Sequence, residues 1–291
     1  MITFCLSTFN TLNYLKLAVK SVRENSFYKD APFVIHAENC TDGTDEWLDQ
    51  VKEKYNLTVF VEKNKIPRGI GGGMNFCASK VDTKYIGFLS SDFYMALDWD
   101  KELVDICERR PEERLWTFSH RVEPDIFNDP TQRPGTIKVP VDMFGELYNN
   151  FNETNFLNWA SEFSEINSFE IQKPEGVSGV IRKSDWDYIG GNDDRFAPMY
   201  WEDADIFIRM LNEGFDFVLT SKSVLYHFAS RTSRFPDDDF ENRPSHLAQY
   251  EQSSVRKFLE KYGRFPSHNS TGCFLPMEPI DGSPNRIKSN V

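Results

Sequence analysis

Strand-like and helix-like segments alternate through the N-terminal third of the chain, and this order restricts the possible folds. Alternating or continuous apolar residues predict strands, and apolar residues spaced by three and four predict the helices between them. Since each strand is followed by a helix, we expect an α/β fold with a doubly wound, mostly parallel sheet and helices on both faces. The predicted strands are 2–6, 33–35, 57–61, 85–89 and, further on, 224–226. The predicted helices are 12–22, 47–55 and 72–80, and Asp42 or Thr44 is the predicted cap of the second one.

Polar residues follow each of the first four predicted strands. Ligands of such sheets bind beyond the carboxyl ends of the strands, so these loops are the expected place for chemistry. Each loop alone is equally well explained as a turn, because Asn, Asp and Gly favour turns. No G-x-G-x-x-G follows the first strand and no Walker motif is present, which argues against ordinary dinucleotide and P-loop sites. The loops contain residues 7–10, 38–39, 64 with 69–73, and 90–92.

Composition excludes several classes of protein. With 40% hydrophobic residues, the 291-residue chain can bury a substantial core. The net charge of −12, without any long run of Lys or Arg, argues against a nucleic-acid partner. Five scattered cysteines without a C-x-x-C pair indicate neither a disulfide framework nor a zinc site. The chain opens on a strand, and no apolar run is long enough to span a membrane, so we expect a cytoplasmic protein.

Six segments in a fixed order resemble the family 2 glycosyltransferases, whose GT-A fold joins a nucleotide-binding half to an acceptor half. The resemblance covers about residues 1–227, with a weaker match at FLEKYG, 258–263. It implies a nucleotide-sugar half at 1–120, an acceptor and catalytic half at 121–227, and a mobile loop, helix and extended tail at 228–291. The segments are CLSTFNTLNYLKLAVKSV, HAENCTDGTDEWL, NKIPRGIGGGMNFCASK, YIGFLSSDFYMALDWDKEL, GVSGVIRKSDWDYIGGNDDRFAPMYWEDADIFIRMLNEGF and VLYHF.

The resemblance also implies a donor site for a nucleotide diphosphate sugar, with a UDP sugar as the first expectation. The family's Asp-x-Asp metal motif reads Ser90-Ser91-Asp92 here, so a single acid remains. Asp92 and His227 are the expected ligands of Mn²⁺ or Mg²⁺, and the other four histidines are expected to be structural. Ala37 stands where the family's nucleoside-binding Asp is expected, and Glu38 matches with a one-residue shift. The implied donor-binding residues are Thr8, Phe9, Asn10, Glu38, Asn39, Asn64, Gly69, Asn75, Ser91, Asp92 and Arg231.

The stretch MYWEDADIFIR places three carboxylates at the start of an amphipathic helix. Helix starts favour acids, so one or two need no function. The resemblance implies that Asp203 is the general base of an inverting transfer to a carbohydrate hydroxyl, with Glu202 beside it. Asp205 either orients its neighbours or caps the helix. The implied acceptor-binding residues are Trp201, Asp193 and Gly179, and for Trp201 aromatic packing is an equal alternative.

The rest of the chain gives weaker signals. Residues 121–175 are either a packing insert or a wall of the acceptor site, with a helix predicted in their aromatic stretch. Residues 228–245 are predicted to form a mobile loop, in which Arg231 or Arg234 could contact the diphosphate. The tail after residue 264 is expected to be extended or loosely attached.

Two alternative functions remain open at the level of sequence. One is another GT-A class, of the β-galactosyl or polypeptide N-acetylgalactosaminyl type, because such enzymes also carry a Trp-Glu-Asp-like helix start. The other is a non-catalytic carbohydrate- or nucleotide-binding protein, because Ser90 replaces the first acid of the metal motif.

Overall fold

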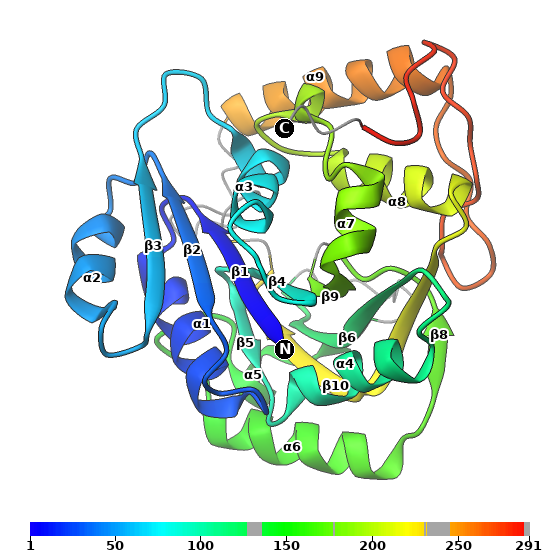
Figure 1. The fold of residues 1–291 in the computed structure, drawn as a ribbon. Helices are drawn as coiled ribbons and strands as arrows, with labels where there is room; N and C mark the ends of the chain where they lie inside the picture. Colours follow the sequence, from blue (N-terminus) through cyan, green and yellow to red (C-terminus); the bar gives the residue numbers. More distant parts are fainter. Residues whose placement is uncertain (127–135, 177, 230, 232–244, 288–291) are drawn as a thin grey trace.

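A ten-stranded mixed sheet crosses the described part of the molecule (Figure 1). The computed structural model describes residues 1–126, 136–176, 178–229, 231 and 245–287. The first four strands pair in parallel, as predicted, and β9 joins them to the second half in antiparallel pairing. The strand order is β3 (Leu57–Glu62), β2 (Phe33–Glu38), β1 (Ile2–Thr8), β4 (Tyr85–Ser90), β9 (Gly179–Arg182), β6 (Leu115–Pro124), β10 (Asp216–His227), β5 (Phe93–Met95), with β7 (Thr136–Val139) on β6 and β8 (Glu170–Gln172) on β10.

Helices cover both faces of this sheet, which confirms the predicted α/β architecture. One face packs against α1 and α4, and the other packs against α3, α7 and α8. A third cluster joins α6 to β5 and β10. The helices are α1 (Leu12–Asn25), α2 (Thr44–Val51), α3 (Gly69–Ala78), α4 (Trp99–Arg109), α5 (Val141–Phe144), α6 (Glu153–Ile166), α7 (Lys183–Ile189), α8 (Glu202–Asn212) and α9 (Ser245–Tyr262).

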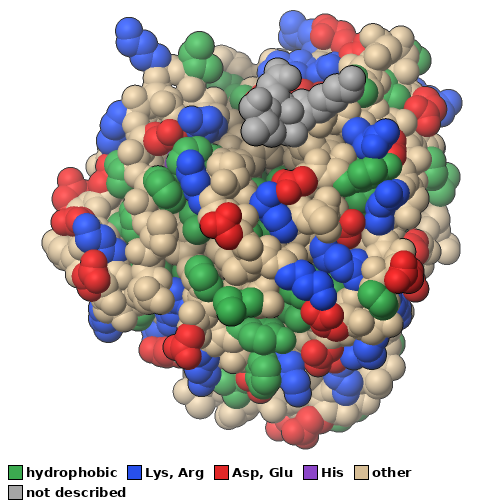
Figure 2. All heavy atoms as spheres, in the orientation of Figure 1, with side chains coloured by type: hydrophobic (Ala, Val, Ile, Leu, Met, Phe, Trp, Pro, Cys, Tyr) green, Lys and Arg blue, Asp and Glu red, His purple; other side chains and the backbone are tan. Residues whose placement is uncertain are grey.

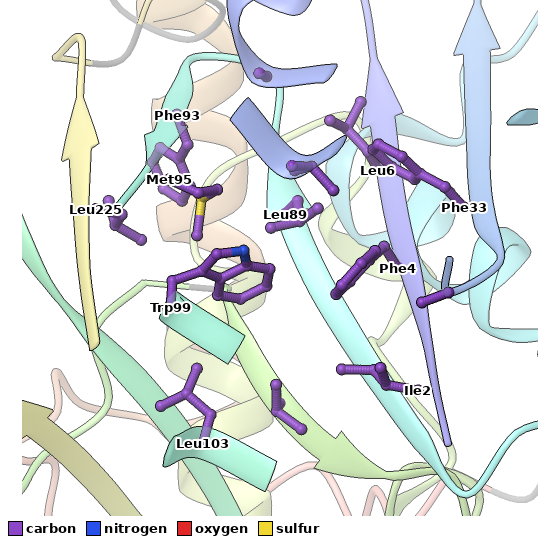
Figure 3. Packing of buried hydrophobic residues seen from close by; sticks show 14 of the residues in the cluster. Ile2, Phe4, Leu6, Phe33, Leu89, Phe93, Met95, Trp99, Leu103 and Leu225 are labelled. Atoms are coloured by element: carbon purple, nitrogen blue, oxygen red, sulfur yellow. The ribbon is translucent and has the colours of Figure 1, made fainter. Parts of the chain in front are cut away.

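Trp99 links the two parts of the sheet. Its buried ring lies 5.5 Å from the ring of Phe4 on β1, and its indole N–H donates to Ser26 Oγ at 2.9 Å. Figure 3 shows Trp99 between Phe4 and Leu225 of β10. Because Trp99 packs against residues from both parts of the sheet, this apolar cluster helps to hold the two parts together.

Three sequence expectations need correction at element boundaries. Neither Asp42 nor Thr44 is the N-cap of α2; that residue is Gly43, with φ +89°, while the Asp42 carboxylate accepts the N–H groups of Thr44 and of Leu12 at the start of α1. Helix α3 begins at Gly69 rather than at residue 72, so the glycine run forms its first turns. The strand expected at 224–226 is the end of the longer β10.

The C-terminal part is extended, as expected, but it is firmly attached. Cys273 and Met277 are buried, and the N–H of Ile287 donates to the carbonyl of Ile189 at 3.1 Å. The predicted loop at 228–245 lies largely outside the described residues, and so does Arg234. The aromatic stretch of the 121–175 segment forms α6, whose Phe156 packs on β10.

The described surface carries charges of both signs. Figure 2 shows acidic and basic side chains intermixed over the face that it draws. Within the described ranges, no helix has both the length and the apolar character needed to cross a bilayer.

Candidate active site

The carboxyl ends of β1 and β4 meet through a chain of hydroxyl groups. Thr8 and Thr11 hydroxyls are 3.0 Å apart, and Thr11 Oγ1 donates to Ser91 Oγ at 2.8 Å. All three residues are buried, whereas Phe9 is 44% exposed. Asn10 has φ +49°, and its side-chain oxygen accepts the N–H of Thr41 at 2.7 Å. The parallel topology therefore brings these predicted donor-side residues to one edge of the sheet.

Glu38 ties the end of β2 to the start of α3. Its buried carboxylate accepts bonds from Asn64 Nδ2 at 2.8 Å and from the N–H groups of Arg68 and Gly69 at 2.8 and 3.0 Å. Asn39 and Asn64 exchange two further hydrogen bonds. A carboxylate at a helix start is stabilised by the free N–H groups there. The structure thus explains Glu38 by helix capping, and its contact with a nucleoside stays a prediction.

The start of α3 also holds the segment that precedes α8. The N–H of Ile70 donates to the carbonyl of Pro198 at 2.9 Å. Gly69 has φ +71°, and a Cβ atom there would lie 1.9 Å from the Pro198 oxygen, so only glycine fits. Further along α3, the Asn75 side chain bonds both backbone groups of Asn192. Gly69 and Asn75 are therefore explained by packing of α3 against the second half, and their donor contacts stay predictions.

Asp92 and His227 lie side by side because β5 pairs with the end of β10. His227 is the register partner of Phe93, and Asp92 Oδ2 is 3.3 Å from His227 Nε2. Burial opposes the charge on Asp92, but His227 and the hydroxyl of Ser90, which donates to Oδ1 at 2.6 Å, lower the pKa of the Asp92 carboxyl to about 2. Burial likewise opposes protonation of His227, but Asp92 and Glu123 outweigh it and raise the pKa of the imidazole. The pair is therefore an ionised carboxylate beside a basic imidazole.

Glu123 is the residue of this site that the sequence did not single out. Its Oε1 lies 2.6 Å from His227 Nδ1, and its Oε2 lies 2.5 Å from the Lys138 ammonium. A carboxylate on the far nitrogen of a histidine fixes the ring and its tautomer, as in the outer shell of many metal sites. Glu123 lies on β6 and His227 on β10, so the contact depends on the pairing of two distant strands. No local sequence signal marks it.

Arg231 lies beside Asp92. Its N–H donates to Asp92 Oδ2 at 2.9 Å, and its guanidinium lies over the Tyr14 ring at 5.5 Å and donates to the carbonyl of Glu146. The backbone of Arg231 thus contacts the remaining acid of the Ser90-Ser91-Asp92 motif. Its contact with a diphosphate stays a prediction.

Asp92 and His227 would be the ligands of a divalent cation at this place, and the imidazole would have to lose its Nε2 proton to bind the cation. One oxygen and one nitrogen donor face each other at 3.3 Å, and Glu123 supports the histidine from behind. Within the described ranges, no group of three or more His, Cys, Asp or Glu side chains could hold a metal ion. Diphosphate and water oxygens would have to supply the remaining ligands, which is the usual mode for Mg²⁺ in nucleotide sites.

The start of α8 carries the carboxyl pair. Glu202 is 7% exposed, and its Oε2 has no hydrogen-bond partner among the described residues. Burial, together with the charge of Asp203, raises the pKa of Glu202 to about 8. Asp203 is more exposed, and its Oδ1 accepts the N–H of Ala204 at 2.7 Å. Two adjacent carboxyls therefore have different environments, and only Glu202 is enclosed.

Arg121 lies beside Glu123 and is surrounded by carboxylates. This guanidinium lies 2.6 Å from Glu175 and 3.1 Å from Glu123. Burial opposes its charge, yet the nearby carboxylates raise the pKa of Arg121, and both Asp92 and Asp203 contribute. Arg121 is thus linked to Asp92 by contacts through Glu123 and His227, whereas Asp203 contributes only its charge, and its role as the base stays a prediction.

The three predicted acceptor residues have packing roles in the structure. Gly179 is buried in the sheet, and a Cβ there would lie 2.1 Å from the carbonyl of Thr117. The Asp193 carboxylate pairs with Lys261 and Arg195, both at 2.9 Å. The half-buried ring of Trp201 lies 4.6 Å from that of Phe258. Their contacts with an acceptor stay predictions.

Known proteins match the chain in sequence and in fold. Abequosyltransferase RfbV of Salmonella typhimurium is 30% identical over 101 residues, which is 34% of this chain and 30% of RfbV. The structure of GalNAc-T7 with UDP, GalNAc and Mn²⁺ matches with a TM-score of 0.57 at 15% identity, over 78% of this chain and 43% of that one. Residues 1–349 of S. aureus TarS in complex with UDP match with a TM-score of 0.51 at 16% identity, over 89% of this chain and 71% of that one.

The chain covers less than half the length of RfbV and of GalNAc-T7. The structural matches show the GT-A fold. The sequence profile described as "Glycosyl transferase family 2" matches residues 3–165, more than half of the chain. This chain belongs to glycosyl transferase family 2.

Proposed function

We propose that the chain is an inverting glycosyltransferase that moves a sugar from a nucleotide diphosphate sugar to a carbohydrate hydroxyl, with Mn²⁺ or Mg²⁺. The observation that supports it most is at the carboxyl ends of the strands, where the hydroxyls of Thr8, Thr11 and Ser91 form a hydrogen-bonded chain and Asp92 lies 3.3 Å from His227. UDP is the proposed nucleotide, because the similar structures of TarS and GalNAc-T7 both contain it.

Asp203 is the proposed general base. Inversion needs a group that takes the acceptor proton on the face opposite the leaving diphosphate. A buried, protonated Glu202 cannot compete for that proton, and a pair of carboxyls in unlike environments commonly divides acid and base roles. Asp203 is partly exposed, whereas Glu202 is buried, so we assign the acceptor proton to Asp203.

Asp92 and His227 would hold the cation, and Glu123 would orient the imidazole. The cation supplies positive charge to the leaving diphosphate. The chain's own contribution is to keep Asp92 ionised through Ser90 and the backbone of Arg231, and to fix the His227 ring. The residues that keep Asp92 ionised and His227 in place are therefore present even though one motif acid is replaced by Ser90.

Release of UDP from a panel of UDP sugars, with Mn²⁺, Mg²⁺ or chelator and water as acceptor, tests this proposal. We expect metal-dependent release and, from an α-linked donor, a β-anomer as the first product in NMR spectra. Binding of UDP without release from any nucleotide sugar would instead support the non-catalytic alternative. Retained anomeric configuration would contradict the inverting mechanism.

A further inference from the structure

The backbone just before the carboxyl pair has an unusual conformation. Tyr200 and Trp201 both have positive φ, +73° and +70°, which bulky L residues rarely adopt. Trp201 is also the N-cap of α8, and its side chain makes no capping hydrogen bond. Such a conformation persists only where the surroundings fix it. The position of Asp203, two residues further on, therefore depends on what holds residues 197–201, here called the α8 entry turn.

One face of α9 contacts this turn at successive helical positions. Ser254 Oγ donates to the carbonyl of Met199 at 2.9 Å, and Lys257 Nζ donates to that of Ala197 at 3.1 Å. The ring of Phe258, one turn after Ser254, packs on Trp201. Residues three and four apart lie on the same side of a helix, so these contacts form one continuous surface.

The same face continues into a buried ionic cluster at the first turn of α8. Asp205 is fully buried and bonds Lys261 Nζ at 2.7 Å and Tyr262 OH at 2.9 Å. Its other oxygen pairs with Arg209 Nε at 2.7 Å. Lys261 also reaches Asp193 at 2.9 Å. Every charge in the cluster has an opposite partner, so the cluster rigidly links α9 to α8.

We propose that this α9 face, made of Ser254, Lys257, Phe258, Lys261 and Tyr262, is a positioning device that holds the entry turn so that Asp203 points at the acceptor. The inference rests on the proposed function of Asp203. The α9 residues touch no reacting group themselves, and they act through Asp203. Their loss should lower kcat and leave the affinity for UDP and Mn²⁺ unchanged, because the donor side of the site is fixed by β1, β4 and β10.

The test uses the full chain and two matched pairs of variants. Ser254→Ala removes one bond to the turn, and the neighbouring Ser253→Ala is its control. Tyr262→Phe removes the hydroxyl on Asp205, and Tyr250→Phe, on the exposed side of the same helix, is its control. We expect Ser254→Ala and Tyr262→Phe to lower kcat roughly five- to tenfold, the effect of about one hydrogen bond. UDP titration by calorimetry gives the active fraction and the affinity.

A double variant that combines Ser254→Ala with Asp203→Asn separates an effect on the position of Asp203 from a general loss of folded, active protein. If α9 acts through Asp203, Ser254→Ala should cause no further loss of kcat in the Asp203→Asn background. The same loss in both backgrounds, or a Ser254→Ala rate equal to that of Ser253→Ala, overturns the inference alone. An Asp203→Asn protein that turns over at the parent rate overturns the base assignment, and the inference with it.

Discussion

Ionisation of Glu202 opposes folding, and this predicts how stability changes with pH. The side chain is 7% exposed, and burial with the nearby Asp203 charge raises its pKa to about 8. In the unfolded chain a glutamate titrates near 4.5. The folded state therefore binds more protons between these values, so the free energy of unfolding should fall as pH rises from about 4.5 to about 8.

The size of the effect follows from the shift. One pKa unit corresponds to about 1.4 kcal/mol, so the shift from 4.5 to about 8 is worth on the order of 5 kcal/mol. Glu202→Gln keeps the shape of the side chain and removes the titrating group. The variant should thus gain stability relative to the parent as pH rises, while any cost of the buried amide stays constant with pH.

Urea unfolding, followed by tryptophan fluorescence at several pH values between 4.5 and 8.5, measures this difference. Titrating groups that do not interact with Glu202 cancel because they are common to both proteins, and the measured difference therefore belongs to Glu202 together with its neighbour Asp203. Glu260→Gln, at an exposed position of α9, is the control and should show no pH-dependent difference. A stability difference between Glu202→Gln and the parent that does not vary with pH would refute the reasoning, because Glu202 would then be no more protonated in the folded than in the unfolded chain.

Three further predictions concern binding, turnover and packing. Asp92→Ala should abolish the gain in UDP affinity that Mn²⁺ provides, and calorimetry showing the same gain as in the parent would contradict the metal assignment. Asp203→Asn should lower turnover by about 10²- to 10⁴-fold with UDP affinity kept, as measured by UDP release and titration. Gly69→Ala should destabilise the fold by well over the 1 to 2 kcal/mol or so of a left-handed alanine, because its Cβ would meet Pro198. Gly214→Ala, with φ +75° and open space around it, should show only that smaller cost in thermal unfolding, so equal losses at both positions would refute the clash.

The first half of the fold could be predicted because its strands are short apolar runs with regular helices between them. The parallel order then placed the residues after these strands at one edge of the sheet, and that is where Thr8, Glu38 and Ser91 lie. The glycine run was the exception. Glycine disfavours helices, yet the capping carboxylate of Glu38 and the close approach of Pro198 make α3 begin at Gly69.

The partners of the site residues were not predictable, because they come from distant segments. Glu123 bonds His227 across 104 residues of sequence, and the contact exists only because β6 and β10 are neighbours. Nothing in the residues around Glu123 differs from an ordinary strand. Arg121, two residues earlier on the same strand, was not predicted either, because its partner Glu175 is also distant in sequence.

The two sides of the site are therefore fixed in different ways. On the proposed donor side, Asp92 follows a strand of the parallel sheet, and Ser90, His227 and the backbone of Arg231 hold its carboxylate directly. On the other side, Asp203 follows a turn whose φ angles its own residues disfavour, and contacts from α3 and α9 hold that turn. Substitutions near Asp92 should consequently change binding, whereas distant substitutions in α9 should change turnover. We therefore expect α9 variants to have a lower kcat and an unchanged affinity for UDP, which a survey of both quantities across α9 would test.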